Sequence, residues 1–187
     1  MKAITVVMKD KKAGDVTVQN KAYVERAAAL AIYNNINDVV FDNCKFVGRQ
    51  DTLYGGTNSY VEFNECSIYG GTDYIFGGMI AIFNKCDLVF NTSEDKNDVG
   101  YITAAQQKSG RGYLMYECHI TSTTPGVDTA SEYTSKPGYL GRPWQADTSE
   151  VVFYNTTIDA ADAHWNGGSL IQLMHKRVFR YPVTTTY

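Results

Sequence analysis

The stretch Phe63-Asn64-Glu65-Cys66-Ser67-Ile68 decides the fold, because its pattern occurs five times along the chain. Each copy has a large apolar residue, two polar residues, a small residue and, two positions later, another apolar residue. The copies are FDNCKF at 41–46, FNECSI at 63–68, FNKCDL at 83–88, MYECHI at 115–120 and FYNTTI at 153–158. Their small residues are separated by 22, 20, 32 and 38 positions. A period of 20 to 22 residues with occasional insertions is typical of a solenoid.

The composition of the repeats selects the kind of solenoid. The copies are rich in Phe, Tyr, Ile and Val, which favour strands, whereas pairs of helices need a longer period. The Leu-x-x-Leu-x-Leu pattern of leucine-rich repeats does not occur. We therefore predict an all-β fold, a parallel β-helix whose coils stack at about 4.8 Å. One segment conflicts locally with this prediction, since Tyr23–Tyr33 (YVERAAALAIY) favours a helix by propensity.

The whole chain has the composition of one folded domain, which we expect to span residues 1–187. Its 187 residues are 44% apolar and 20% charged, which excludes a disordered chain and a coiled coil. The formal net charge of −3 gives no electrostatic basis for binding nucleic acid. No run of about 18 apolar residues is present to cross a membrane. The first ten residues do not have the pattern of a signal peptide.

The four cysteines, Cys44, Cys66, Cys86 and Cys118, all belong to the repeats. They form no Cys-x-x-Cys pair and have no histidine at ligand spacing, so we expect no metal site. Their even number leaves a disulfide framework open. We favour buried free thiols that act as small apolar side chains.

Aligning the copies on Cys44 and Cys66 brings two aspartates together. Asp51 and Asp73 each lie seven residues after the cysteine of their coil, and each follows a glycine three residues earlier. Equivalent positions of neighbouring coils are stacked, so we expect their α-carbons to lie about 5 Å apart. Two stacked carboxyl groups do not both ionise easily, so one retains a proton, as a nucleophile paired with a general acid requires. The spacing alone also fits a solvated ladder of aspartates or an aspartate that caps a turn.

Three segments resemble the signature blocks of the pectin methylesterase (pectinesterase) family. They are Gly48–Tyr54 (GRQDTLY), Asp73–Gly77 (DYIFG) and Tyr139–Trp144 (YLGRPW). Ile102–Gln106 and Val16–Asn20 also resemble the family, and the similarity extends over about residues 15–165. The resemblance implies a right-handed parallel β-helix that hydrolyses the methyl esters of galacturonate in pectin, with water as co-substrate and without a metal or organic cofactor.

The same resemblance implies the catalytic roles. Asp73 is the nucleophile that attacks the ester carbonyl. Asp51 is the acid that protonates departing methanol and then the base that activates water. Gln50 donates to the oxyanion, and Arg142 orients Asp73 through charge-assisted hydrogen bonds. A purely structural role of Arg142, as a cation that bridges coils, is the alternative.

The resemblance also implies a substrate-binding set, which consists of Trp144, Tyr74, Thr72 and Arg26. Trp144 offers a flat face for a sugar ring, unless it is a core residue. Arg26 stands where the family has a second oxyanion glutamine. An arginine there can donate to the oxyanion, or it can pair with Asp51 and impair the acid.

The chain departs from the family in length. Coils on the N-terminal side of the family's motifs are largely missing, and residues 166–187 form a tail that resembles nothing we can place. A solenoid needs caps on its open ends. We therefore expect a fragment, a short member that lacks N-terminal coils and a C-terminal cap, or a protein that self-associates through these ends. The resemblance also implies secretion and a role in pectin catabolism and cell-wall modification.

The sequence leaves two other functions open. Carboxyl groups about 5 Å apart also suit a retaining glycosidase, and a pectin lyase is a related alternative that requires calcium and a basic residue. The missing coils and Arg26 are compatible with an inactive β-helix that only binds carbohydrate.

Overall fold

The computed structural model describes residues 12–19, 28–90, 100–107, 111–122, 139–142, 144 and 150–158. Their strands form three parallel sheets. The first sheet contains, in spatial order, β1 (Lys12–Gly14), β4 (Val39–Asp42), β7 (Tyr60–Asn64), β10 (Ile80–Asn84), β13 (Tyr113–Tyr116) and β16 (Val151–Tyr154). The second contains β2 (Thr17–Gln19), β5 (Lys45–Val47), β8 (Ser67–Gly70), β11 (Asp87–Phe90), β14 (His119–Ser122) and β17 (Thr157–Ile158). The third contains β3 (Leu30–Ile32), β6 (Leu53–Gly55), β9 (Ile75–Gly77), β12 (Tyr101–Ala105) and β15 (Tyr139–Gly141).

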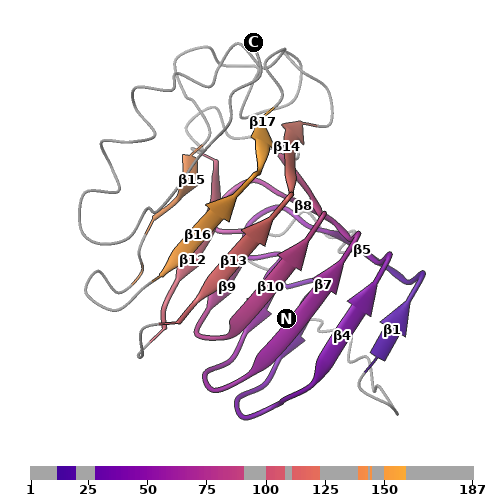
Figure 1. The fold of residues 1–187 in the computed structure, drawn as a ribbon, viewed down its shortest axis with the longest axis vertical. Coiled ribbons are helices and arrows are strands. Elements are labelled where there is room, and N and C mark those ends of the chain that lie inside the picture. The colour runs from indigo at the N-terminus through magenta and orange to yellow at the C-terminus, as the bar shows by residue number, and fades with distance from the viewer. Residues whose placement is uncertain are drawn as a thin grey trace.

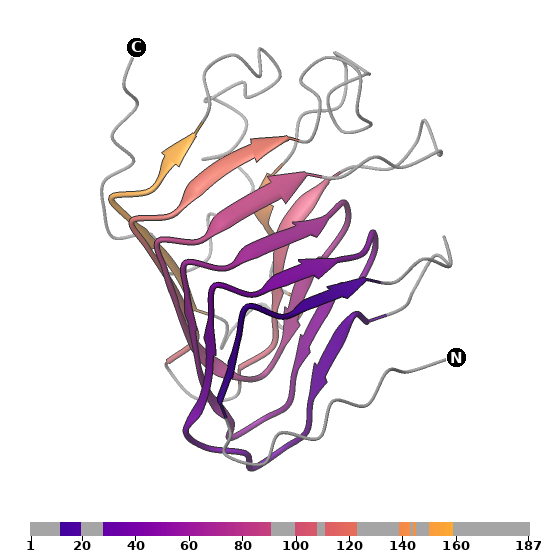
Figure 2. The same cartoon turned by 90° about the vertical axis from the view of Figure 1, so that its right-hand side faces the viewer.

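The first five coils each contribute one strand to each sheet in turn, the last described coil contributes β16 and β17, and strands in equivalent positions of neighbouring coils pair with one another. The strands of the first sheet therefore lie side by side in Figure 1, and the coils lie one above another in Figure 2. The predicted all-β parallel β-helix is confirmed. The register also confirms the alignment of the repeats, since Phe41 pairs with Phe63, and Phe63 with Phe83.

The second polar residue of each repeat makes the corner between the first and second sheets. All five of these residues have positive φ, between 48° and 54°: Asn43, Glu65, Lys85, Glu117 and Asn155. A left-handed residue turns the chain sharply within one position. The polar pair in the repeat therefore encodes the corner, and the apolar residues on either side encode the strands.

The small residue that follows this corner points into the core. Cys66 is buried, and its thiol donates to the carbonyl oxygen of Phe41 in the preceding coil at 3.4 Å. Cys118 does the same to Phe83 at 3.2 Å. In the last copy Thr156 replaces cysteine, and its hydroxyl donates to Met115 at 3.1 Å. All four cysteines are buried free thiols, as predicted, and they serve as small hydrogen-bond donors.

The core between the three sheets is built from stacked rows of side chains. The rings of Phe41 and Phe63 stack with centroids 5.1 Å apart, and those of Phe63 and Phe83 at 4.7 Å. Phe46 meets Phe63 edge to face at 6.0 Å. Such aromatic contacts add to the free energy of simple apolar burial.

The helix favoured by the propensities of Tyr23–Tyr33 is wrong where the structure describes this segment. Leu30–Ile32 forms β3, in which Leu30 pairs with Leu53, and Leu30 and Ile32 are buried. Strand pairing and burial outweigh the helix propensities, which contribute only about 0.5 kcal/mol per residue. Residues 23–27 lie outside the described residues. Among the residues that are described, no helix is long and apolar enough to span a membrane.

Candidate active site

Asp51 and Asp73 occupy equivalent positions in the loops that lead from the second sheet into the third. Leu53 pairs with Ile75, so the aspartate two residues before each strand has the same place in its coil. The backbone N–H of Asp51 donates to the carbonyl of Thr72 at 3.1 Å, which joins the two loops. Both aspartates have positive φ, 62° and 51°. The stacked register predicted from the repeats is therefore present.

Gly70 allows the chain to turn this tightly before Asp73. A Cβ at this position would collide with the Cβ of Tyr74 and lie 2.9 Å from the carbonyl oxygen of Arg49. Gly48 has the same role one coil earlier, where a Cβ would lie 2.6 Å from the hydroxyl of Thr52. Close packing therefore requires a glycine three residues before each aspartate.

Arg142 reaches the pair from the opposite side. It follows β15 directly, and its backbone N–H donates to Thr103 at 2.8 Å. Its Nε donates to Oδ1 of Asp73 at 2.8 Å, and its Nη2 donates to Oδ2 of the same carboxylate. The hydrogen bond and the charge of Asp73 raise the pKa of the Arg142 guanidinium above its ordinary value, although its partial burial acts in the other direction. The guanidinium therefore remains cationic and holds a carboxylate that is only 12% exposed.

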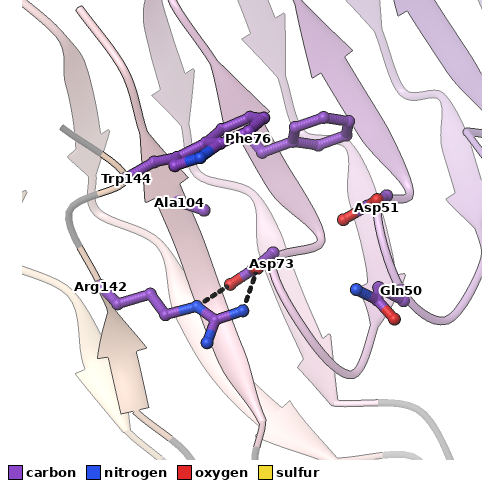
Figure 3. Close-up of a pocket in the computed structure, with 7 residues that line it drawn as sticks. All are labelled: Gln50, Asp51, Asp73, Phe76, Ala104, Arg142 and Trp144. Carbon is purple, nitrogen blue, oxygen red and sulfur yellow. Dashed lines mark hydrogen bonds and ion pairs between the residues drawn. The ribbon is translucent and has the colours of Figure 1, made fainter. Parts of the chain in front are cut away.

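Asp51, Asp73 and Arg142 line a pocket of about 460 Å³ on the face of the third sheet that points away from the core. Its lining consists of Gln50, Asp51, Asp73, Phe76, Ala104, Arg142 and Trp144. Figure 3 shows Asp73 between Arg142 on one side and Asp51 with Gln50 on the other. The charged groups thus gather at one end of the pocket.

Aromatic rings line the rest of the pocket. Phe76 lies 6.1 Å from Trp144 between ring centroids, and 5.1 Å from Tyr54 of the preceding coil. Trp144 is 58% exposed, so it is not a core residue. Exposed faces of this kind are suited to packing against the apolar side of a sugar ring.

Two members of the predicted substrate-binding set do not face the pocket. Tyr74 is 0% exposed and packs edge to face on Phe90, so its assignment to the substrate is wrong. The left-handed Asp73 breaks the in–out alternation of the strand, and Tyr74 consequently points into the core. Thr72 holds Asp51 through its carbonyl but does not line the pocket. Arg26 lies outside the described residues.

The sequence did not reveal every residue of the site. Ala104 lies within the segment that resembles the family, but nothing in its neighbourhood marks it as facing a pocket. Tyr101 contacts Arg142 and was missed, because the 32-residue interval before Cys118 hides which coil position it occupies. Its only signal was its place directly before that segment. No group of three or more metal-ligating side chains occurs among the described residues.

Fold and site together define a parallel β-helix protein with a candidate active site of two stacked carboxyl groups beside a guanidinium. Comparison with known proteins then gives the family. The pectinesterase family model matches residues 1–174, which is most of the sequence, so this chain belongs to the pectinesterase family.

Individual relatives agree with this assignment. The chain is 29% identical over 180 residues to "Probable pectinesterase/pectinesterase inhibitor 64" of Arabidopsis thaliana, an alignment that covers 87% of this chain and 29% of the relative. It is 34% identical over 149 residues to "Probable pectinesterase A" of Aspergillus niger. This alignment covers 77% of this chain and 40% of the relative. The chain thus spans less than half the length of these curated relatives.

Solved structures share the fold. The pectin methylesterase from carrot superposes with a TM-score of 0.66 at 27% identity, over 79% of this chain and 45% of that one. The pectin methylesterase from Aspergillus niger gives a TM-score of 0.62 at 32% identity, over 76% of this chain and 44% of that one.

Proposed function

We propose that this chain hydrolyses the methyl esters of galacturonate in pectin, with Asp73 as nucleophile and Asp51 as general acid and base. The observation that carries the proposal is the pair of hydrogen bonds from Arg142 to Asp73 in a pocket that also contains Asp51. The two hydrogen bonds hold the Asp73 carboxylate in one orientation. Asp51 lies on the other side of Asp73 from Arg142 (Figure 3). This asymmetry gives the two carboxyl groups different surroundings, which supports different roles for them.

In the first half of the reaction, an oxygen of the Asp73 carboxylate attacks the ester carbonyl carbon. The carbonyl oxygen becomes an oxyanion that accepts a hydrogen bond from the side-chain amide of Gln50. The bond between the carbonyl carbon and the methoxy oxygen then breaks, and Asp51 gives its proton to the departing oxygen. Methanol leaves, and the galacturonyl group remains attached to Asp73 as an anhydride.

In the second half, Asp51 has become a carboxylate and takes a proton from water. The resulting hydroxide oxygen attacks the same carbonyl carbon, and the bond to Asp73 breaks. The product leaves as galacturonic acid, which loses its proton to solvent, while Asp73 regains its charge beside Arg142 and Asp51 again holds a proton. No step requires a metal or an organic cofactor.

The aromatic side of the pocket supports a polysaccharide as the substrate. Trp144 and Phe76 offer apolar faces next to the reacting groups, where a sugar ring can pack. Related pectin methylesterases have been crystallised in complex with hexasaccharides, at 25% and 26% identity to this chain. Homogalacturonan outside the cell, in plant cell walls, is the corresponding substrate for this chain.

The test is the release of methanol from highly methylated pectin, measured together with the viscosity of the solution. Ester hydrolysis releases methanol without shortening the polymer, whereas glycosidase or lyase action lowers the viscosity. Asp73→Asn and Asp51→Asn should each reduce methanol release to background. His119→Ala is the control, because His119 pairs with Asp87 and does not line the pocket.

Two outcomes would reject the proposal. Retained activity in Asp73→Asn would remove the nucleophile. Binding of pectin without release of methanol over about pH 4 to 9 would favour the carbohydrate-binding alternative.

A further inference from the structure

We propose that Tyr101 is a positioning residue for Arg142, because its ring forms the platform on which the guanidinium lies while it donates to Asp73. The Cζ atom of Arg142 lies over this ring, 4.6 Å from its centroid. This is within the range at which a cation is attracted to the negative face of an aromatic ring. The catalytic consequence of this contact rests on the function proposed above, but the contact itself does not.

Tyr101 comes next to Asp73 through the stacking of the coils. Thr103 of β12 pairs with Ile75 of β9, so the start of β12 lies beside the Asp73 loop. The backbone N–H of Tyr101 donates to Gly71 at 2.9 Å, and its carbonyl oxygen accepts from Tyr74 at 3.4 Å. The backbone of Tyr101 is therefore tied to both sides of Asp73.

The ring is also held by the following coil. Tyr101 pairs with Tyr139 in the sheet, and their rings stack with centroids 5.1 Å apart and planes inclined by 18°. Tyr139 thus supports the ring that Arg142 covers. The platform is fixed by a strand register and by a stacked neighbour, so it does not depend on Arg142 for its own position.

The guanidinium needs such a platform. The Arg142 side chain is 49% exposed, and a flexible side chain of this length loses several rotatable bonds when it is fixed. The two hydrogen bonds to Asp73 constrain the direction in which the guanidinium points, and the ring constrains where it lies. Burial raises the pKa of the Tyr101 phenol, and the charge of Arg142 offsets this only in part, so the ring remains neutral at the pH of the reaction.

The direct test is the exchange of the Arg142 Nε–H with solvent, followed by nitrogen-15 NMR. The resonance is identified by its disappearance in Arg142→Lys. We expect Tyr101→Leu to accelerate this exchange about tenfold, and Tyr101→Phe, which retains the ring, to leave it within about twofold of the original rate. Tyr116→Leu is the matched control, because it removes an equivalent tyrosine stack, with Tyr154, that lies outside the pocket.

A second series tests the electrostatic part of the contact without changing the shape of the side chain. Phenylalanine analogues with one, two and three fluorines at position 101 weaken the negative face of the ring progressively. We expect the exchange rate to rise with each fluorine. A flat series, or an unchanged rate in a folded Tyr101→Leu variant, would overturn the proposal.

Methanol release provides the catalytic readout. If Tyr101 acts by positioning Arg142, Tyr101→Leu should lower kcat about tenfold with little change in KM, and Tyr101→Phe should restore kcat. Equal kcat values in Tyr101→Leu and Tyr101→Phe would reject the effect of the Tyr101 ring on catalysis. Absence of methanol release by the unmodified protein would reject the proposed function instead, while the exchange experiment would still decide the role of Tyr101.

Discussion

Arg142 donates two hydrogen bonds to the carboxylate of Asp73, which lies 69 residues earlier in the sequence. The two residues meet because the coils between them stack in register. Asp73 stands in the loop before β9, and Arg142 follows β15, with β12 paired between them. The contact therefore depends on the fold as a whole, and a change at either residue reports on both the site and the solenoid.

Replacement of Arg142 by lysine should reduce the rate of methanol release about 10- to 100-fold. Lysine keeps the charge but does not offer the planar pair of donors that Asp73 accepts. The loss of one hydrogen bond to a charged group corresponds to about 1.5–3 kcal/mol. Initial rates at saturating pectin measure the effect.

Arg111→Lys is the control for this experiment, because Arg111 is exposed and does not line the pocket. An unchanged rate in Arg142→Lys would show that charge alone is sufficient at this position.

Much of this site could be predicted because the repeats encode the register. The offset of seven residues after Cys44 and Cys66 was enough to stack Asp51 on Asp73. Arg142 entered only through a family resemblance, since the 38-residue interval before Thr156 conceals its coil position. Long insertions interrupt the period, and the period was the only source of spatial information.

The errors also have physical causes. Tyr74 was assigned to the substrate, but the positive φ of Asp73 rotates it into the core. The helix favoured by Tyr23–Tyr33 is replaced by β3 where this segment is described, because Leu30 and Ile32 pair and pack with the next coil. Local propensity and simple alternation fail where the backbone turns or where pairing with a neighbouring coil decides the conformation.

Tyr74→Phe should stabilise the protein by about 1 kcal/mol, which corresponds to a rise in Tm of about 2–4 °C. The Tyr74 hydroxyl is buried and has no hydrogen-bond partner among the described residues. Removal of an unsatisfied hydroxyl from a core abolishes its desolvation cost. Urea unfolding, followed by circular dichroism, gives the free energy of unfolding.

Tyr113→Phe is the matched control with the opposite sign. The Tyr113 hydroxyl is equally buried but donates to Gly77 at 2.7 Å, so its removal should destabilise the protein. Equal effects of the two substitutions would contradict the distinction between a satisfied and an unsatisfied hydroxyl.

The protein should lose stability as the pH rises above about 10, and Tyr113 should account for part of this loss. Burial raises the pKa of the Tyr113 phenol well above its ordinary value. In the unfolded chain the phenol ionises at about pH 10, whereas in the folded protein it keeps its proton. The unfolded state therefore binds fewer protons, and the free energy of unfolding falls with rising pH by up to about 1.4 kcal/mol per pH unit for this group.

The measurement is the slope of the free energy of unfolding between about pH 9.5 and 11, from urea titrations at several pH values. Tyr113→Phe should reduce the magnitude of this slope by up to about 1.4 kcal/mol per pH unit. A slope in Tyr113→Phe equal to that of the unmodified protein would be the contrary result.

Position 118 should accept threonine better than valine. The thiol of Cys118 donates to the carbonyl of Phe83, and in the next coil the hydroxyl of Thr156 makes the equivalent bond to Met115. Threonine and valine have nearly the same shape, so Cys118→Thr retains a donor and Cys118→Val lacks one. We expect Cys118→Val to be less stable than Cys118→Thr by about 1 kcal/mol in urea unfolding, the typical net contribution of one buried hydrogen bond. Equal stabilities, or a more stable valine variant, would show that the repeats select this residue for its size alone.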